Sequence, residues 1–145
     1  MNVTESNFSI RDDCISIGNK KEQLHITKVT CGPRYGISVG SLGGNPSEKP
    51  VVGVFANNCT FISTDNGVRI KTWPASHTGV VSDVHFEDII VQNVSNLILI
   101  DQVYCPSGKC NKNEITDSWQ PLTEMQVEAA YNSSLVVGPF PRPCA

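Results

Sequence analysis

The stretch RDDCISIG, residues 11–18, contains the pattern that decides the fold of this chain. Two adjacent aspartates precede a short run in which apolar and polar residues alternate. Alternation with a period of two predicts a β-strand with one buried face. By itself, a pair of aspartates before a strand is typical of a solvated turn. The role of the pair therefore depends on what the rest of the chain places beside it.

The same strand of three residues, apolar then variable then apolar, recurs along the chain. The four copies are Ile15–Ile17, Ile37–Val39, Val68–Ile70 and Ile98–Ile100. They start roughly 20 to 30 residues apart, and the longer intervals hold the insertions GSLGGNPSEKP and KTWPASHTGVVSD, which is the signature of a solenoid. We therefore predict an all-β fold, a right-handed parallel β-helix of about four coils over residues 3–101.

Stacking the coils predicts which side chains meet, because equivalent positions of neighbouring coils lie about 4.8 Å apart. The predicted columns are Asp13 with Tyr35 and Asn66, Asp12 with Arg34 and Asp65, and Ser16 with Ser38 and Arg69. The third column is expected to face outward, because the apolar residues beside it face inward. Lys71, two residues after Arg69, shares that face. The sequence thus predicts an exterior patch of two carboxylates, a tyrosine, an arginine and a lysine.

Composition and charge exclude several classes of protein. The chain has 145 residues, of which 39% are hydrophobic and 17% charged, as in an ordinary globular domain. A net charge of −3 argues against a nucleic-acid partner, because phosphate contacts need a basic surface. The longest apolar runs, such as residues 97–100, fall far short of the roughly 20 residues that span a bilayer. We expect neither nucleic-acid binding nor a membrane segment.

The cysteines suggest disulfides rather than a metal site. Six cysteines without a CxxC pair, and only three histidines, argue against zinc. Five N-glycosylation sequons begin at Asn2, Asn7, Asn58, Asn93 and Asn132, which together with disulfides would suit an oxidising compartment. The opening residues MNVTESNFSI lack the basic and apolar regions of a signal peptide. We expect either a piece of a longer protein or a protein that is not secreted.

Four strings, in register with the coil repeat, resemble the plant polygalacturonases of glycoside hydrolase family 28. They are DDCISIG, CGPRYGISVGSLG, NGVRIKTWP and DQVYCPSGKC, and the resemblance covers roughly residues 3–113. It implies a right-handed parallel β-helix that hydrolyses the α-1,4-galacturonan of pectin with inversion. It also implies no cofactor and action in the cell wall or outside the cell. We expect the folded chain to be a monomer.

Carried over residue by residue, the resemblance makes Asp12 the general acid and Asp13 a carboxylate that activates water. Arg69 and Lys71 would bind the carboxylates of the sugar. The chemistry agrees, because inverting hydrolysis needs one protonated and one ionised carboxyl group. A guanidinium can also fork onto a carboxylate, and an ammonium adds a point charge.

The cysteines follow the same resemblance in part. Cys14 and Cys31 border neighbouring coils and resemble a disulfide of the family, and Cys105 and Cys110 can close a small loop. The alternation of inward and outward residues predicts that the side chain of Cys59 points into the core. We assign no partner to Cys144.

The chain also departs from the family. The Gly-His-Gly of the family is Arg34-Tyr35-Gly36 here, so Tyr35 occupies the position of the catalytic histidine. A phenol with a pKa of about 10 donates a hydrogen bond but does not shuttle protons near neutral pH. The glycine before the aspartates is Arg11, and the third aspartate of the family, in an Asn-Thr-Asp motif, would precede Met1.

The coil pattern is lost after Asn113. We therefore divide the chain into a partial β-helix, residues 1–113, and a divergent irregular tail, residues 114–145. Two functions compete. One is a pectin hydrolase, and the alternative is a catalytically inactive β-helix fragment that at most binds galacturonan. The missing aspartate and Tyr35 favour the alternative for the chain as it stands.

Overall fold

The structure is a computed structural model that describes residues 1–9, 12–74, 77, 79–110, 125–130 and 134–137. Over these residues the regular elements are all β-strands. The described part of the chain holds no helix of the length and hydrophobicity that crossing a membrane requires.

Eleven of the strands wind into four stacked coils. The first coil holds β1 (Asn2–Thr4), β2 (Asn7–Phe8) and β3 (Asp13–Ile17). The second holds β4 (Lys21–Thr27), β5 (Thr30–Cys31) and β6 (Arg34–Leu42). The third holds β7 (Val51–Asn57), β8 (Thr60–Ile62) and β9 (Thr64–Thr72). The fourth holds the long strand β10 (Val81–Gln92) and β11 (Asn96–Asp101).

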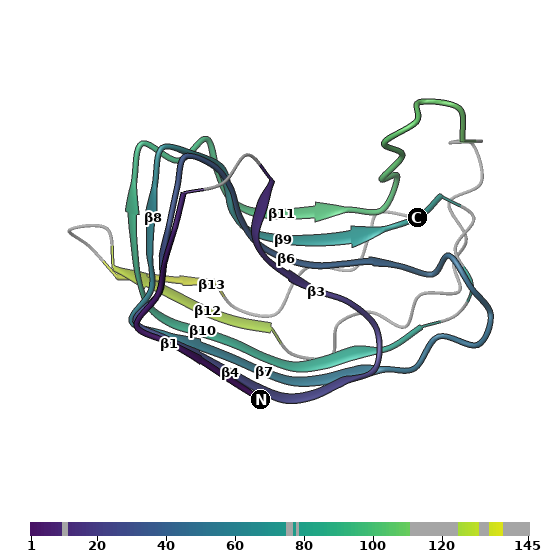
Figure 1. The fold of residues 1–145 in the computed structure, drawn as a ribbon, viewed down its shortest axis with the longest axis horizontal. Helices are drawn as coiled ribbons and strands as arrows, with labels where there is room; N and C mark the ends of the chain where they lie inside the picture. The colour runs from purple at the N-terminus through teal and green to yellow at the C-terminus, as the bar shows by residue number, and fades with distance from the viewer. Residues whose placement is uncertain (10–11, 75–76, 78, 111–124, 131–133, 138–145) are drawn as a thin grey trace.

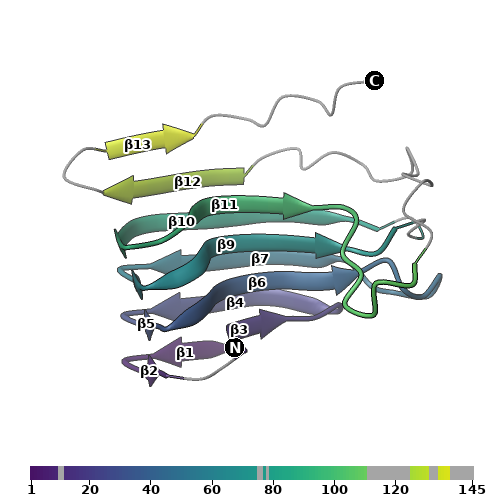
Figure 2. The ribbon, with the colours of Figure 1, turned by 90° about the horizontal axis from the view of Figure 1, so that it is seen from above.

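Strands of successive coils pair in parallel, so the coils form three faces. The first face is β1-β4-β7-β10, the second is β2-β5-β8 with the end of β10, and the third is β3-β6-β9-β11. Figure 1 looks along the stack, with the first face below, the second at the left and the third above. Figure 2 shows the coils stacked one upon another. The predicted right-handed parallel β-helix of about four coils is confirmed.

The predicted register holds on the third face. Ile15 lies opposite Ile37, Ile37 opposite Val68, and Val68 opposite Ile98. The column of Asp13 and the column of Ser16 form as expected. The column of Asp12 is wrong, because Arg34 lies opposite Thr64 instead of Asp65. The register shifts between Arg34 and Tyr35, where the chain turns onto the third face.

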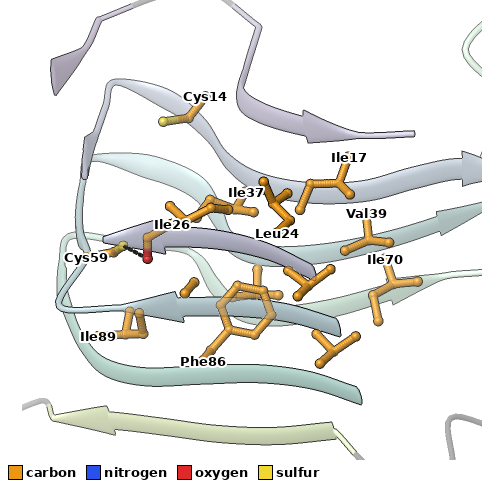
Figure 3. Close-up of a cluster of buried hydrophobic side chains, with 14 of the residues drawn as sticks. Cys14, Ile17, Leu24, Ile26, Ile37, Val39, Cys59, Ile70, Phe86 and Ile89 are labelled. Atoms are coloured by element: carbon orange, nitrogen blue, oxygen red, sulfur yellow. Dashed lines mark hydrogen bonds between the residues drawn. The ribbon is translucent and has the colours of Figure 1, made fainter. Parts of the chain in front are cut away.

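The core fills the space between the faces with branched aliphatic and aromatic side chains. Among the fully buried side chains are Phe61, Phe86, Ile26 and Ile37, and Figure 3 shows part of this cluster. Burying each such side chain contributes about 1.5–3 kcal/mol. Cys59 is a free cysteine with no exposed surface, as predicted, and its Sγ lies 4.0 Å from the carbonyl oxygen of Ile26.

At the corner between the first and second faces, one residue of each coil has a left-handed backbone conformation. Glu5, Lys28, Asn58 and Asp88 all have φ between 48° and 56°. The amide of each of the first three donates to a carbonyl of the next coil at 3.1 Å. The polar breaks of the sequence repeat therefore correspond to turns that pair from coil to coil.

The prediction of an irregular tail is wrong for two segments. β12 (Met125–Ala130) pairs in parallel with β10, and β13 (Ser134–Val137) pairs antiparallel with β12. The outer edge of β10 offers unpaired backbone groups, and a strand can satisfy them without continuing the coil repeat. Cys144 and the sequon asparagine Asn132 lie outside the described residues.

Candidate functional site

The two adjacent aspartates occupy different environments. Asp12 is exposed, and its Oδ1 accepts a hydrogen bond from the backbone amide of Asp13 at 2.8 Å. Asp13 begins β3, and its side chain is only 9% exposed. One carboxylate is thus open to solvent while its neighbour is enclosed by protein.

Asp13 is held on both carboxylate oxygens. Its Oδ2 accepts from Lys71 Nζ at 2.6 Å, and its Oδ1 accepts from Ser38 Oγ at 2.8 Å. The side chain of Lys71 is 6% exposed. These are charge-assisted or short hydrogen bonds between nearly buried side chains, and such bonds are strongest where the local dielectric constant is low. The structure therefore brings the predicted Asp13 and Lys71 into direct contact.

Arg69 is paired in a similar way. Its Nη2 donates to Asp101 Oδ2 at 2.8 Å, and the two side chains are 16% and 21% exposed. The other oxygen of Asp101 accepts from the amide of Val103 at 3.2 Å. Arg69 Nε is buried and has no partner among the described residues.

Tyr104 covers both cations. Its ring centroid lies 5.1 Å from Arg69 Cζ and 4.9 Å from Lys71 Nζ, within the range of cation–π attraction. Its amide donates to the carbonyl of Thr72 at 3.1 Å, and Trp73 packs edge-on against the ring. The segment after β11 rises from the third face and turns back across the ends of β9 and β6 (Figures 1 and 2).

The prediction of an open exterior patch is therefore wrong in part. The residues share the outer side of the third face, but Ser38 and Lys71 are buried there. Over Lys71 lies Tyr104, which belongs to the segment after β11 and not to the coil repeat, and Ser38 is in contact with Asp13. Within the four-coil part that the structure describes, Asp12 remains exposed while Lys71 and Arg69 are each paired with a carboxylate.

Sequence reasoning missed Asp101 and Tyr104, although both lie in the string DQVYCPSGKC. The coil repeat in the sequence is sufficient to place Asp101. Extending the coil register by one strand places Asp101 opposite Lys71 and Leu99 opposite Arg69. No comparable signal marks Tyr104, because it follows the last strand of the repeat.

Tyr35 is half-buried and lies between Asp13 and Asn66 in its column. Gly36 follows it at a point where the coils approach closely. A Cβ at Gly36 would overlap the carbonyl oxygens of Gly67 and Asn66. The glycine thus allows the coils to stack beside Tyr35.

Two disulfides flank the site. Cys14 in β3 is bonded to Cys31 in β5, with 5.6 Å between their Cα atoms. Cys105 is bonded to Cys110, with 6.0 Å between the Cα atoms, and closes the loop that follows Tyr104. Among the residues that the structure describes, no group of three or more His, Cys, Asp or Glu side chains is placed to hold a metal ion.

Comparison with known proteins gives a family and several relatives. The sequence model of glycosyl hydrolases family 28 matches residues 1–137. A polygalacturonase of Nicotiana tabacum is 77% identical over 113 residues, which is 78% of this chain and 28% of the relative. A polygalacturonase of Gossypium hirsutum is 54% identical over 114 residues, 79% of this chain and 28% of the relative. An exopolygalacturonase of Oenothera organensis is 49% identical over 110 residues, 76% of this chain and 30% of the relative.

These matches cover most of the chain but a small part of each relative. The chain spans less than a third of the length of the curated relatives it matches. No solved structure matches it. The resemblance to plant polygalacturonases is confirmed by the identities and by the family match. Because that match covers nearly the whole sequence, the chain belongs to glycosyl hydrolases family 28.

Proposed function

We propose that this chain takes part in the hydrolysis of α-1,4-galacturonan, the polyanion of pectin, as a polygalacturonase. The observation that carries the proposal is the contact of Asp13 with Lys71 on the outer side of one β-helix face, with Arg69 on the same face and the exposed Asp12 next to Asp13 in the sequence. Two carboxyl groups beside cations suit the acid–base cleavage of an anionic sugar chain. The names of the relatives, polygalacturonase and exopolygalacturonase, agree with this substrate class.

In the proposed reaction, Asp12 donates its proton to the oxygen that leaves the anomeric carbon. Asp13 accepts a proton from a water molecule, which attacks the anomeric carbon from the opposite side and inverts its configuration. The glycosidic bond breaks, and a new bond forms from the anomeric carbon to the water oxygen. Asp13 keeps acceptor sites for this water, because an ionised carboxylate has about four lone-pair sites and two hydrogen bonds to it are observed.

The two cations take different roles in this proposal. Arg69 binds a galacturonate carboxylate, since only one of its five N–H groups is used by Asp101. Lys71 lies 2.6 Å from Asp13 and orients that carboxylate. A sugar carboxylate can reach Lys71 only by sharing its ammonium with Asp13. Tyr35 occupies the histidine position of the family, and its backbone pairs with that of Asp13 in the column.

We also propose that the protein acts outside the cell, in the cell wall, as a monomer that binds pectin. The two disulfides support this compartment, because such bonds persist in oxidising surroundings. The division of the chain at residues 113 and 114 stays a prediction.

The experiment is the release of reducing ends from polygalacturonate by the purified chain. Asp12→Asn should lower the rate by about 10²- to 10⁴-fold, the usual effect of removing a positioned acid. Asp88→Asn, the same change at an exposed aspartate outside the site, should leave the rate unchanged. Tyr35→His should raise it if a proton shuttle limits the reaction.

Measuring the binding of polygalacturonate as well as its cleavage distinguishes the hydrolase from the inactive galacturonan-binding fragment. A chain that binds polygalacturonate but releases no ends, with or without Tyr35→His, would support the inactive galacturonan-binding alternative. Neither binding nor release, from a folded chain, would contradict both.

A further inference from the structure

We infer that Asp101 is a positioning residue that fixes the guanidinium of Arg69 for a galacturonate carboxylate, an inference that rests on the proposed function. It acts through Arg69. The ion pair is short, at 2.8 Å, and both side chains are mostly buried. Only Nη2 of Arg69 contacts Asp101, while Nε has no partner among the described residues. Because Nε is buried, the donors left for a second carboxylate are those of Nη1 and the second N–H of Nη2.

Asp101 can fix Arg69 because Asp101 is itself fixed. Its backbone pairs with Lys71 at the end of β11, and its second carboxylate oxygen accepts from the amide of Val103. Both oxygens are thus engaged. The position of Nη2 is consequently set by the β-helix backbone and not by the free rotation of an arginine side chain.

Tyr104 limits Arg69 from another direction. Its ring lies over the guanidinium at 5.1 Å, and its amide is bonded to the carbonyl of Thr72. A hydrogen bond at one end and an aromatic ring over the plane together select one orientation of Arg69. An arginine side chain otherwise has many rotamers, whose loss opposes binding.

Removing the charge of Asp101 would have two opposite effects on an anionic ligand. It would remove a negative charge from the neighbourhood of the ligand, which favours binding, and it would release Arg69, which opposes binding. The charge of Asp101 is already compensated by Arg69 at 2.8 Å, so the loss of order should dominate. We therefore expect Asp101→Asn to weaken binding, whereas a role as a mere repelling charge would strengthen it.

The first test is calorimetric binding of trigalacturonate to the 145-residue chain. Asp101→Asn should weaken binding about tenfold, which corresponds to about 1.4 kcal/mol. In an Arg69→Gln background the same change should have no further effect, and Asp101→Glu should restore most of the loss. Asp88→Asn serves as the matched control and should bind like the unmodified chain. Unchanged or tighter binding by Asp101→Asn would overturn the inference.

The second test needs neither activity nor ligand. The Nε–H NMR signal of Arg69, assigned by its absence in Arg69→Gln, should be sharp in the unmodified chain and broadened or shifted in Asp101→Asn. In an acid titration of the unmodified chain, this signal should change together with the carboxyl carbon signal of Asp101. An Arg69 signal that is the same in Asp101→Asn and throughout the acid titration would refute the positioning role.

The two tests separate this inference from the proposed function. If the unmodified chain binds no trigalacturonate, the proposed function fails for this chain, and the NMR result alone decides whether Asp101 orders Arg69. Should Asp101→Asn not fold, Asp101→Glu and the acid titration still give that decision.

Discussion

Lys71 and Asp13 come from strands two coils apart, and the ammonium of one lies 2.6 Å from the carboxylate of the other. The intervening strand β6 contributes Ser38, which donates to the second oxygen of Asp13. The contact thus joins the first, second and third coils through polar side chains. It is both a structural link and the centre of the proposed site.

Breaking this pair should destabilise the fold strongly. Lys71→Met leaves the carboxylate of Asp13 nearly buried and without its cation, and such a change costs about 3–5 kcal/mol of unfolding free energy. Urea unfolding followed by circular dichroism measures the loss. The double variant Lys71→Met with Asp13→Leu should regain much of it, because no unpaired charge then remains.

The exposed pair of Lys28 with Glu5 is the matched control. Its side chains are 58% and 73% exposed, so Lys28→Met should change stability by no more than about 0.5 kcal/mol. Equal effects at Lys28 and Lys71 would contradict the structural role of the buried pair.

Gly36 should not tolerate a side chain. In Gly36→Ala the new Cβ would overlap the carbonyl oxygen of Gly67, which belongs to the backbone of the next coil and cannot move away alone. We expect little folded protein, seen as loss of the cooperative unfolding transition. Gly18→Ala is the control, because nothing lies within 4 Å of its Cβ position, and it should be neutral or slightly stabilising. Two equally stable variants would show that the coils are not packed as closely as described.

An aromatic ladder on the outer side of the first face should contribute to stability. Phe55 stacks between His25 and His85, with ring centroids 4.9 Å and 5.1 Å apart and planes within 13°. Each aromatic pair contributes about 0.5–1.5 kcal/mol beyond the area it buries. A double-mutant cycle of Phe55→Leu and His25→Leu, followed by thermal unfolding, should therefore show a coupling free energy of that size. Strictly additive effects would mean that the stack is only a geometric coincidence.

The buried thiol of Cys59 predicts a pH dependence. Burial raises the pKa of Cys59, because desolvation penalises the thiolate. A group whose pKa is higher in the folded state contributes stability below its unfolded pKa of about 8.5 and loses it as the pH rises through the folded pKa. The unfolding free energy of the native chain, measured relative to Cys59→Ala at each pH, should therefore fall above about pH 8.5. A difference that stays constant from pH 7 to pH 10.5 would contradict the burial of the thiol.

The strands and their columns could be predicted from the sequence because they depend on local alternation and a repeat. Ile15, Ile37, Val68 and Ile98 share one inward column, since a shift of one residue would turn each apolar side chain out to water. The same register correctly placed Tyr35 between Asp13 and Asn66. The position of the candidate site on the third face was therefore within reach of sequence reasoning.

What only the tertiary structure decided is the environment of these side chains. The burial of Lys71 and its cover by Tyr104 depend on how the segment after β11 returns across the face. β12 likewise pairs with β10 although its segment lies outside the coil repeat. The repeat determines which residues stand side by side along a column, because neighbouring coils are a fixed distance apart. It contains no information on segments that leave the coils, whose positions are set by long-range pairing with free backbone groups and charges.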